Sequence, residues 1–378
     1  MFFLIKKVLK LFLIVCLKLF CFSVQAQNGI SIAPNLHLAK LIKHSQKITF
    51  PLPSQNIGLE VNVKFLKYGQ APWHEARHFP YFGLAGLYYN LGNKEILGEA
   101  VAFVPNIGVP IARKKNWETF FQFGAGIAYL TKFYDINTNP HNTAIGSNVN
   151  NCTQFKVESS WRLSAQHRFT AGGSFTHFSN GAAQYPNLGI NLGGLDVGYQ
   201  YTPQPVERLD FIQKFQSNAV QQHWGAVAYG LLAWKEALVP RGPRYPVYVA
   251  SVGAMYRLNQ RNRVFLCADY EYQRHVHDFV YAILQYSTPQ EANLAASRIG
   301  IGLGEEFLFG RWAVYLQAST YLGHFSVLVP GRRYNRISMR HYLPPFKKDG
   351  KTQVYLAAHL KTHKIVAEYI AYGMGVVF

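Results

Sequence analysis

The chain has little negative charge, and beyond its first residues it lacks a long hydrophobic run. Its 378 residues include 19 Asp and Glu against 38 Lys and Arg, which gives a formal net charge of +19. A transmembrane helix needs about 20 consecutive apolar residues, and no segment after residue 27 supplies them. This absence excludes a membrane protein built from helices. Because 49% of the residues are hydrophobic, the apolar side chains must follow a different pattern.

Cysteine is too sparse for a disulfide framework. Of the four cysteines, Cys16 and Cys21 lie in the N-terminal segment, and neither follows the small residue that a lipoprotein signal requires, so no lipid anchor is expected. Cys152 and Cys267 remain. An oxidising compartment would allow them to form a disulfide, but the sequence does not give the distance between them.

Residues 1–27 have the pattern of a cleaved secretory signal peptide. Lysines precede an apolar stretch, and Ala26 precedes the expected cleavage before Gln27; such a segment takes no part in the fold. The mature chain, residues 28–378, is therefore expected to be exported. Its basic excess suits a phosphorylated lipid surface. We expect no nucleic-acid partner, because the lysines and arginines are scattered rather than gathered on one helix.

Apolar and polar residues alternate in segments of about ten residues through the mature chain. For example, Val264 and Leu266 alternate with Asp269 and Glu271, and alternation places these pairs on opposite faces of a strand. Such segments, separated by turns, are typical of outer-membrane barrels, and an aromatic content of 15% fits their aromatic girdles. The expected strands are 57–69, 80–90, 98–113, 117–131, 153–165, 168–179, 190–202, 222–235, 246–258, 262–274, 297–309, 311–323, 334–344, 352–361 and 365–378.

These segments predict an all-β fold, a single antiparallel transmembrane β-barrel of the outer-membrane type with about 12 to 16 strands. Because a closed barrel of this kind has an even number of strands, a further strand is expected near 38–50. Residues 28–203 carry the motif described below. Residues 204–378 are expected to extend the chain and complete the barrel.

The lengths of the connections predict the orientation of the barrel, because outer-membrane barrels have short periplasmic turns and longer outer loops. The connections 132–151 and 275–296 are long. Short turns are expected near Gln166, Asn259, Gly310 and Lys348. This alternation places the connection 180–189 on the outer-leaflet side, although the long linker 203–221 falls where a short turn is expected.

The segment FTHFSNGAAQYPNLGIN, residues 175–191, places a histidine and a serine on the lipid-facing side of the predicted barrel. His177 and Ser179 share the apolar face of their strand with Phe175, because residues two apart point to the same side. By the same parity, Asn191 in the next strand lies on this outer face.

These residue types suit acyl transfer. Serine becomes nucleophilic when a histidine takes its proton and a third group fixes the histidine tautomer. Asn180, Asn187 and the backbone N–H groups near Ala182 are candidate donors to an oxyanion. An isolated histidine and serine are also common as polar residues at the rim of a barrel, so the pair alone leaves both interpretations open.

The segment HFSNGAAQYPNLGIN resembles the His-x-Ser-Asn … Pro-Asn signature of the outer-membrane lipid A 3-O-deacylases, or acyloxyacyl hydrolase-like proteins. The resemblance implies that His177 is the base, Ser179 the nucleophile and Asn187 an oxyanion amide. The family's orienting glutamate falls on Asn191, which departs from the pattern, and Asp196 points into the barrel by parity. The family's small members are eight-stranded barrels roughly half this length, so the resemblance leaves the C-terminal half unexplained.

A second motif, His74-Glu75-Ala76-Arg77-His78, has the HExxH pattern of zinc proteases. Pro72 and Pro80 restrict it to a segment too short for a stable helix, so we interpret it as an ordinary connection. His275, His277 and Asp278 lie in an expected outer loop and could chelate a cation, but we interpret them as part of a solvated loop.

The chain also contains a glycine-rich strand and a basic stretch. Gly300, Gly302 and Gly304 alternate with apolar residues in a strand instead of opening a helix, so they do not form a dinucleotide site and are expected to make room inside the barrel. The basic stretch 331–336 either binds lipid A phosphates or is a solvated loop.

The sequence therefore favours a serine esterase in the outer membrane of a Gram-negative bacterium, with its site on the outer-leaflet side. Its partners are the bilayer and lipid A, or lipopolysaccharide, from which it removes an ester-linked acyl chain. No metal or organic cofactor is expected. Two alternatives remain: a non-catalytic porin or transporter, and a structural barrel that retains the motif.

Overall fold

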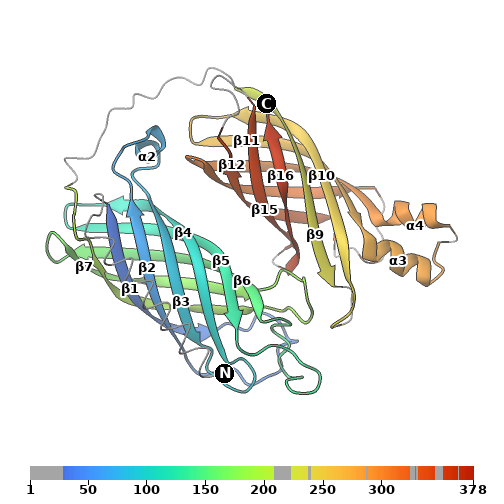
Figure 1. The fold of residues 1–378 in the computed structure, drawn as a ribbon, viewed down its shortest axis with the longest axis horizontal. Coiled ribbons are helices and arrows are strands. Elements are labelled where there is room, and N and C mark those ends of the chain that lie inside the picture. The colour runs from blue at the N-terminus through green and yellow to red at the C-terminus, as the bar shows by residue number, and fades with distance from the viewer. Residues whose placement is uncertain are drawn as a thin grey trace.

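Sixteen antiparallel strands form two closed eight-stranded barrels (Figure 1). The computed structural model describes residues 29–207, 223–236, 240–286, 288–323, 328, 331–344, 352–364 and 366–378. The expected signal peptide and the expected turn near Lys348 lie outside these ranges. No helix within them is long and apolar enough to cross a membrane.

The first barrel closes where β8 pairs with β1, for example Val197 opposite Leu36. A short helix, α2 (Pro72–Ala76), lies between β2 and β3. The strands of this barrel are β1 (Ile30–Leu41), β2 (Asn56–Leu66), β3 (Tyr81–Asn90), β4 (Glu99–Arg113), β5 (Trp117–Leu130), β6 (Val149–Arg162), β7 (His167–Ser179) and β8 (Ile190–Tyr201).

The second barrel closes where β16 pairs with β9, for example Tyr372 opposite Leu232. Two helices, α3 (Arg274–Ala282) and α4 (Pro289–Ala296), lie between β11 and β12 and project to the side of the barrel (Figure 1). The strands are β9 (Trp224–Glu236), β10 (Arg244–Arg257), β11 (Asn262–Gln273), β12 (Ser297–Phe309), β13 (Trp312–Leu322), β14 (Arg333–Tyr342), β15 (Gln353–His363) and β16 (Val366–Val377).

The fold class predicted from the alternation is confirmed, but the prediction of one barrel is wrong. Residues 204–378 do not complete the first barrel, because the β8–β1 ladder has already closed it. Alternation determines the face of each residue, not the strand with which an edge pairs. The strand expected near 38–50 is β1 (Ile30–Leu41). Pro34, which cannot donate a ladder hydrogen bond, obscures that strand in the sequence.

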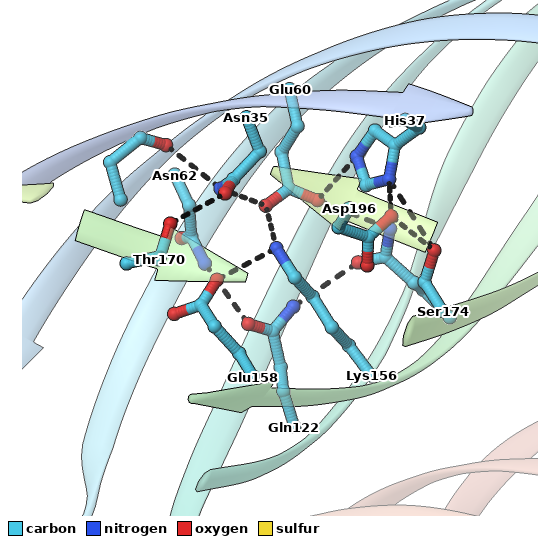
Figure 2. Close-up of polar contacts among 12 residues, drawn as sticks. Asn35, His37, Glu60, Asn62, Gln122, Lys156, Glu158, Thr170, Ser174 and Asp196 are labelled. Atoms are coloured by element: carbon cyan, nitrogen blue, oxygen red, sulfur yellow. Dashed lines mark hydrogen bonds and ion pairs between the residues drawn. The ribbon is translucent and has the colours of Figure 1, made fainter. Parts of the chain in front are cut away.

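The barrels are apolar outside and polar inside. Leu195 on β8 is 69% exposed and Ile127 on β5 is 68% exposed, whereas Lys156 and Glu60 are buried. Figure 2 shows Glu60, Lys156 and other polar side chains from β1, β2, β5, β6, β7 and β8 converging inside the first barrel. Lys156 Nζ donates to Glu60 Oε1 at 3.1 Å and pairs with Glu158 at 2.8 Å. Such burial is the inverse of a soluble barrel and fits a surface that faces lipid.

Three glycines of β12, Gly300, Gly302 and Gly304, make room inside the second barrel, as predicted. A side chain on Gly302 would lie 2.2 Å from Gln317 Nε2, and one on Gly304 would lie 2.4 Å from the Tyr315 hydroxyl. Cys152 and Cys267 are both free and buried, one in each barrel, so they do not form a disulfide.

The connections of each barrel lie at two ends. At one end, called the site end here, lie the first-barrel connections 42–55, 91–98, 131–148 and 180–189. At the opposite end lie α2 and the C-terminal end of β16 (Figure 1). Hydrogen bonds join the barrels at both ends: Arg77 donates to Asn262 Oδ1 at 3.0 Å, and Arg244 donates to Gln184 Oε1 at 3.1 Å.

Candidate active site

His177 and Ser179 lie on the outer face of β7, at the site end. The predicted alternation of this strand is confirmed, because Phe169 is 41% exposed whereas Thr170 and Thr176 are fully buried. Ser179 is itself only 6% exposed, although it faces outward. The connection 180–189 follows it directly, and Gly189 N–H donates to a carbonyl of the connection 131–148 at 2.9 Å. The Ser179 side chain therefore faces the lipid side of the barrel wall, but neighbouring residues bury it.

His177 and Asn191 are direct partners in the β7–β8 ladder, which places their side chains on the same face. His177 Nδ1 lies 2.5 Å from Asn191 Oδ1. An amide oxygen only accepts, so the imidazole carries its proton on Nδ1. His177 Nε2 is then unprotonated and can accept a proton from a hydroxyl.

A second histidine, which the sequence analysis missed, contacts Asn191 from the other side. Asn191 Nδ2 donates to His44 Nδ1 at 2.9 Å, and His44 Nε2 donates to the Leu188 carbonyl at 2.7 Å. His44 lies in the connection 42–55, separated from Asn191 by 147 positions in the sequence. No local pattern marks it; only the closure of β1 on β8 brings the two residues together.

Ser179 and His177 are two positions apart, or about 7 Å along the strand, a spacing that an imidazole and a hydroxymethyl group can bridge. Among the described residues, Ser179 Oγ makes no hydrogen bond to His177. Hydrogen bonds of this kind are often long in an enzyme without its substrate and shorten in the complex.

Within the described ranges, only the oxygen of the Asn187 amide has a hydrogen-bond partner. Its Oδ1 accepts the backbone N–H of Asn180 at 3.0 Å, so the amide is oriented and Nδ2 is left as a donor. Asn180 is committed to the structure of the connection, since its own Nδ2 donates to Ser147 Oγ at 3.0 Å and to the Gln184 carbonyl at 2.8 Å. The Asn187 amide is thus held in one orientation, whereas the Asn180 side chain supports the loop.

The turn after Asn180 presents two backbone donors. Gly181 and Ala182 have φ of 63° and 60°, the left-handed conformation that turns successive N–H groups to one side. Within the described part of the chain, neither N–H has a hydrogen-bond acceptor. Ala182 was the residue predicted to supply such a donor.

Gly189 makes room for the His177 ring. Its φ is +84°, and a side chain on it would lie 2.6 Å from His177 Cε1. The glycine therefore permits both the turn and the close approach of the backbone to the imidazole.

The second barrel holds the connection 180–189 from outside. Glu236 Oε2 accepts the Tyr185 backbone N–H at 2.5 Å, and a side chain on Gly181 would meet Ile370 of β16 at 2.4 Å. Burial raises the pKa of Tyr185, with Glu368 and Glu236 of the second barrel adding to the shift. The C-terminal half thus contacts the candidate site directly.

A serine, a histidine and an aspartate also meet inside the first barrel, but not as a hydrolytic set. Asp196 and Ser174 both approach His37 Nδ1, at 2.5 and 3.4 Å, while His37 Nε2 faces Glu60 at 3.3 Å (Figure 2). Neither ring nitrogen is left to accept a serine proton, and His37 is fully buried. This cluster is part of the packed barrel interior.

The HExxH motif does not form a helical metal site. Helix α2 ends at Ala76, and His78 has φ of 57°, so the two histidines do not lie one turn apart on a helix. Arg77 instead donates to the Arg261 carbonyl and to Asn262, across to the second barrel. No group of three or more His, Cys, Asp or Glu in the described ranges is arranged to hold a metal ion.

Two further expectations are corrected. His275, His277 and Asp278 lie on α3 rather than in a solvated loop; Asp278 accepts from His277 at 2.7 Å and pairs with Arg274 at 2.9 Å. Arg336, expected in a basic outer loop, points into the second barrel and is 1% exposed. It pairs there with a buried aspartate because its position on β14 has inward parity.

Comparison with known proteins gives matches for both halves. The family model "Lipid A 3-O-deacylase (PagL)" matches residues 55–200, and "Acyloxyacyl hydrolase, C-terminal domain" matches residues 222–378. No curated protein matches the chain.

Several solved outer-membrane structures are similar. The outer-membrane enzyme PagL is 13% identical, with a TM-score of 0.30, over 45% of this chain and 98% of its own. Neisserial surface protein A is 8% identical, with a TM-score of 0.33, over 46% of this chain and 97% of its own. The two family matches together span both barrels, and the chain belongs to the lipid A 3-O-deacylase and acyloxyacyl hydrolase-like family of outer-membrane β-barrel proteins.

Proposed function

We propose that this protein is a serine esterase of the outer leaflet that removes an ester-linked acyl chain from lipid A. Ser179 is the nucleophile, His177 the base and Asn191 the residue that orients the base. The observation that supports this proposal best is the contact of His177 Nδ1 with Asn191 Oδ1 at 2.5 Å, because it leaves Nε2 free to take a proton on the strand that carries the serine.

The reaction proceeds in two steps, acylation of Ser179 and hydrolysis of the acyl-enzyme. Ser179 Oγ forms a bond to the acyl carbonyl carbon while its proton passes to His177 Nε2. The Asn187 amide and the N–H groups near Ala182 stabilise the negative carbonyl oxygen. The bond to the sugar oxygen then breaks, and the imidazolium returns the proton to that oxygen. Water attacks the acyl-enzyme in the same way and releases the fatty acid.

The position of the site suits a substrate that is already in the membrane. Below Ser179 the outer wall is apolar, with Leu195 at 69% and Val197 at 45% exposure. Acyl chains can pack against this wall without a soluble pocket. The long connections at the site end fit the outer side of such a barrel, where lipid A resides.

The packed interiors support an enzyme over a porin. In the first barrel, buried Lys156 is paired with Glu60 and Glu158; in the second, fully buried Arg340 donates to Glu306 at 3.0 Å. These ion pairs lie inside the barrels, where a wide pore would have to pass.

Mass spectrometry of lipid A tests the proposed function. Cells that express the protein should contain lipid A that lacks one ester-linked acyl chain, and cells that carry Ser179→Ala or His177→Ala should not. Ser174→Ala is the matched control, since this serine lies on the inner side of the same strand. Identical lipid A with and without the assembled wild-type barrel would overturn the proposal.

A further inference from the structure

We propose that His44 is a positioning residue for the esterase reaction: it fixes the orientation of the Asn191 amide, so that a neutral residue can perform the orienting task of the family's acid. This inference rests on the proposed function of the site. It gives a role to a histidine that lies outside the motif.

The need for a positioning residue follows from the chemistry of an amide. A carboxylate accepts through either oxygen, but an asparagine can present an oxygen or an NH₂ group. If Asn191 Nδ2 faced His177, Nδ1 of that ring would have to accept, and the proton would move to Nε2. His177 could then take no proton from Ser179, and the active tautomer would be lost.

The contacts of His44 select the productive orientation. His44 Nε2 lies 2.7 Å from the Leu188 carbonyl, which only accepts, so Nε2 carries the proton. In the neutral ring Nδ1 is then an acceptor, and it lies 2.9 Å from Asn191 Nδ2. The carbonyl of Ile42, 3.3 Å from Nδ1, has no proton to donate and does not compete. One amide orientation therefore satisfies all three residues, the one that directs Oδ1 to His177.

The fold brings His44 to this position through the closure of the first barrel. Ile42 N–H donates to the Asn191 carbonyl at 2.8 Å, which extends the β1–β8 ladder into the connection 42–55. Gly193 makes room for that connection, because a side chain there would lie 2.8 Å from Ile42 Cδ1. His44 is thus held over Asn191 from the outer side of the wall.

A substitution at Asn191 separates orientation from other roles of His44. With Asn191→Glu, either carboxylate oxygen accepts the His177 Nδ1–H, so no partner is needed to choose an orientation. The effect of removing His44 should therefore be large in the wild-type background and small in the Asn191→Glu background. A purely structural histidine would be needed equally in both.

The experiment compares the full-length wild type, His44→Ala, Asn191→Glu and the double variant, with kcat and KM measured on lipid A in one detergent. We expect His44→Ala to lower kcat about 10- to 100-fold, with little change in KM. The double variant should stay within about threefold of Asn191→Glu alone. His167→Ala is the matched control, because His167 is a partly exposed histidine at the other end of β7, where it contacts the Tyr199 hydroxyl.

A second measurement does not depend on turnover. The ¹⁵N NMR signals of labelled His177 should report an Nδ1–H tautomer in the wild type and a mixture in His44→Ala, while heat-modifiable migration on gels confirms assembly. Unchanged kcat and tautomer in His44→Ala would overturn the inference, as would a double variant as impaired as His44→Ala while Asn191→Glu is active. Inactivity of the assembled wild type and Asn191→Glu alike would overturn the proposed function itself.

Discussion

At the residue scale, hydrogen bonds fix the orientation of two amides of the candidate site, Asn187 and Asn191. Asn187 holds the Asn180 N–H through its oxygen and keeps its amide nitrogen free. Asn191 accepts from His177 on one side and donates to His44 on the other. Because both amides are oriented in the absence of substrate, we expect the proposed reaction to require little reorganisation of them.

The Asn191 amide is expected to support turnover that is slow but measurable. It can hold the His177 tautomer but supplies no charge to the imidazolium, and in the serine-protease template replacing the acid by its amide costs roughly 10⁴ in turnover. We expect Asn191→Ala to be inactive and Asn191→Glu to equal or exceed the wild type in lipid A deacylation rate. An Asn191→Ala variant with wild-type turnover would mean that another residue orients His177.

Gly189→Ala is expected to impair the site without removing any functional group. The new methyl group would lie 2.6 Å from His177 Cε1, at a φ of +84°, so the imidazole must move. We expect kcat to fall roughly 10- to 100-fold, the scale of an ångström-sized misplacement. Gly323→Ala is the control, since it imposes a similar strain at φ +88° with nothing within 4 Å. Equal activity of both variants would contradict this role.

At the element scale, the β7–β8 connection depends on both barrels. Its two strand ends carry the histidine, serine and asparagine, its turn carries the N–H donors, and its tip contacts Glu236 and Arg244 of the second barrel. The second barrel, which matches the acyloxyacyl hydrolase C-terminal domain, therefore holds the loop that we propose to bind the oxyanion.

Glu236→Ala is expected to reduce activity although Glu236 lies in the other barrel. The buried Glu236 carboxylate accepts the Tyr185 N–H, and losing a hydrogen bond to a charged group costs about 1.5–3 kcal/mol. We expect kcat/KM for lipid A to fall roughly tenfold as the loop loosens. Arg241→Ala, which removes a solvent-exposed pair with Asp135, should be close to neutral. Equal rates for both variants would leave the second barrel without influence on the site.

At the scale of the whole molecule, the two barrels share one design, an apolar wall around an interior of buried, paired charges. In the second barrel the Arg340 guanidinium lies 3.7 Å from the centre of the Tyr315 ring and pairs with Glu306. Such buried ions are tolerated because they have partners across the lumen.

The purified protein is therefore expected to form no wide pore. In planar bilayers, single insertions should give none of the large, stable conductance steps of a porin, because paired charged side chains lie inside both eight-stranded barrels. A porin of known conductance, reconstituted in the same bilayers, serves as the positive control. Large steps from the assembled protein would favour the transport alternative.

The sequence by itself determined which residues face lipid and where most strands lie. Period-two alternation is a local property, so it placed His177, Ser179 and Asn191 on one face and predicted fifteen strands. Only the tertiary structure decided that β8 pairs with β1 to close a first barrel, that residues 204–378 form a second, and that His44 contacts Asn191. These outcomes depend on pairing between segments far apart in the chain. The periodicity of a segment sets the face of each residue, but it does not specify the segment with which it pairs.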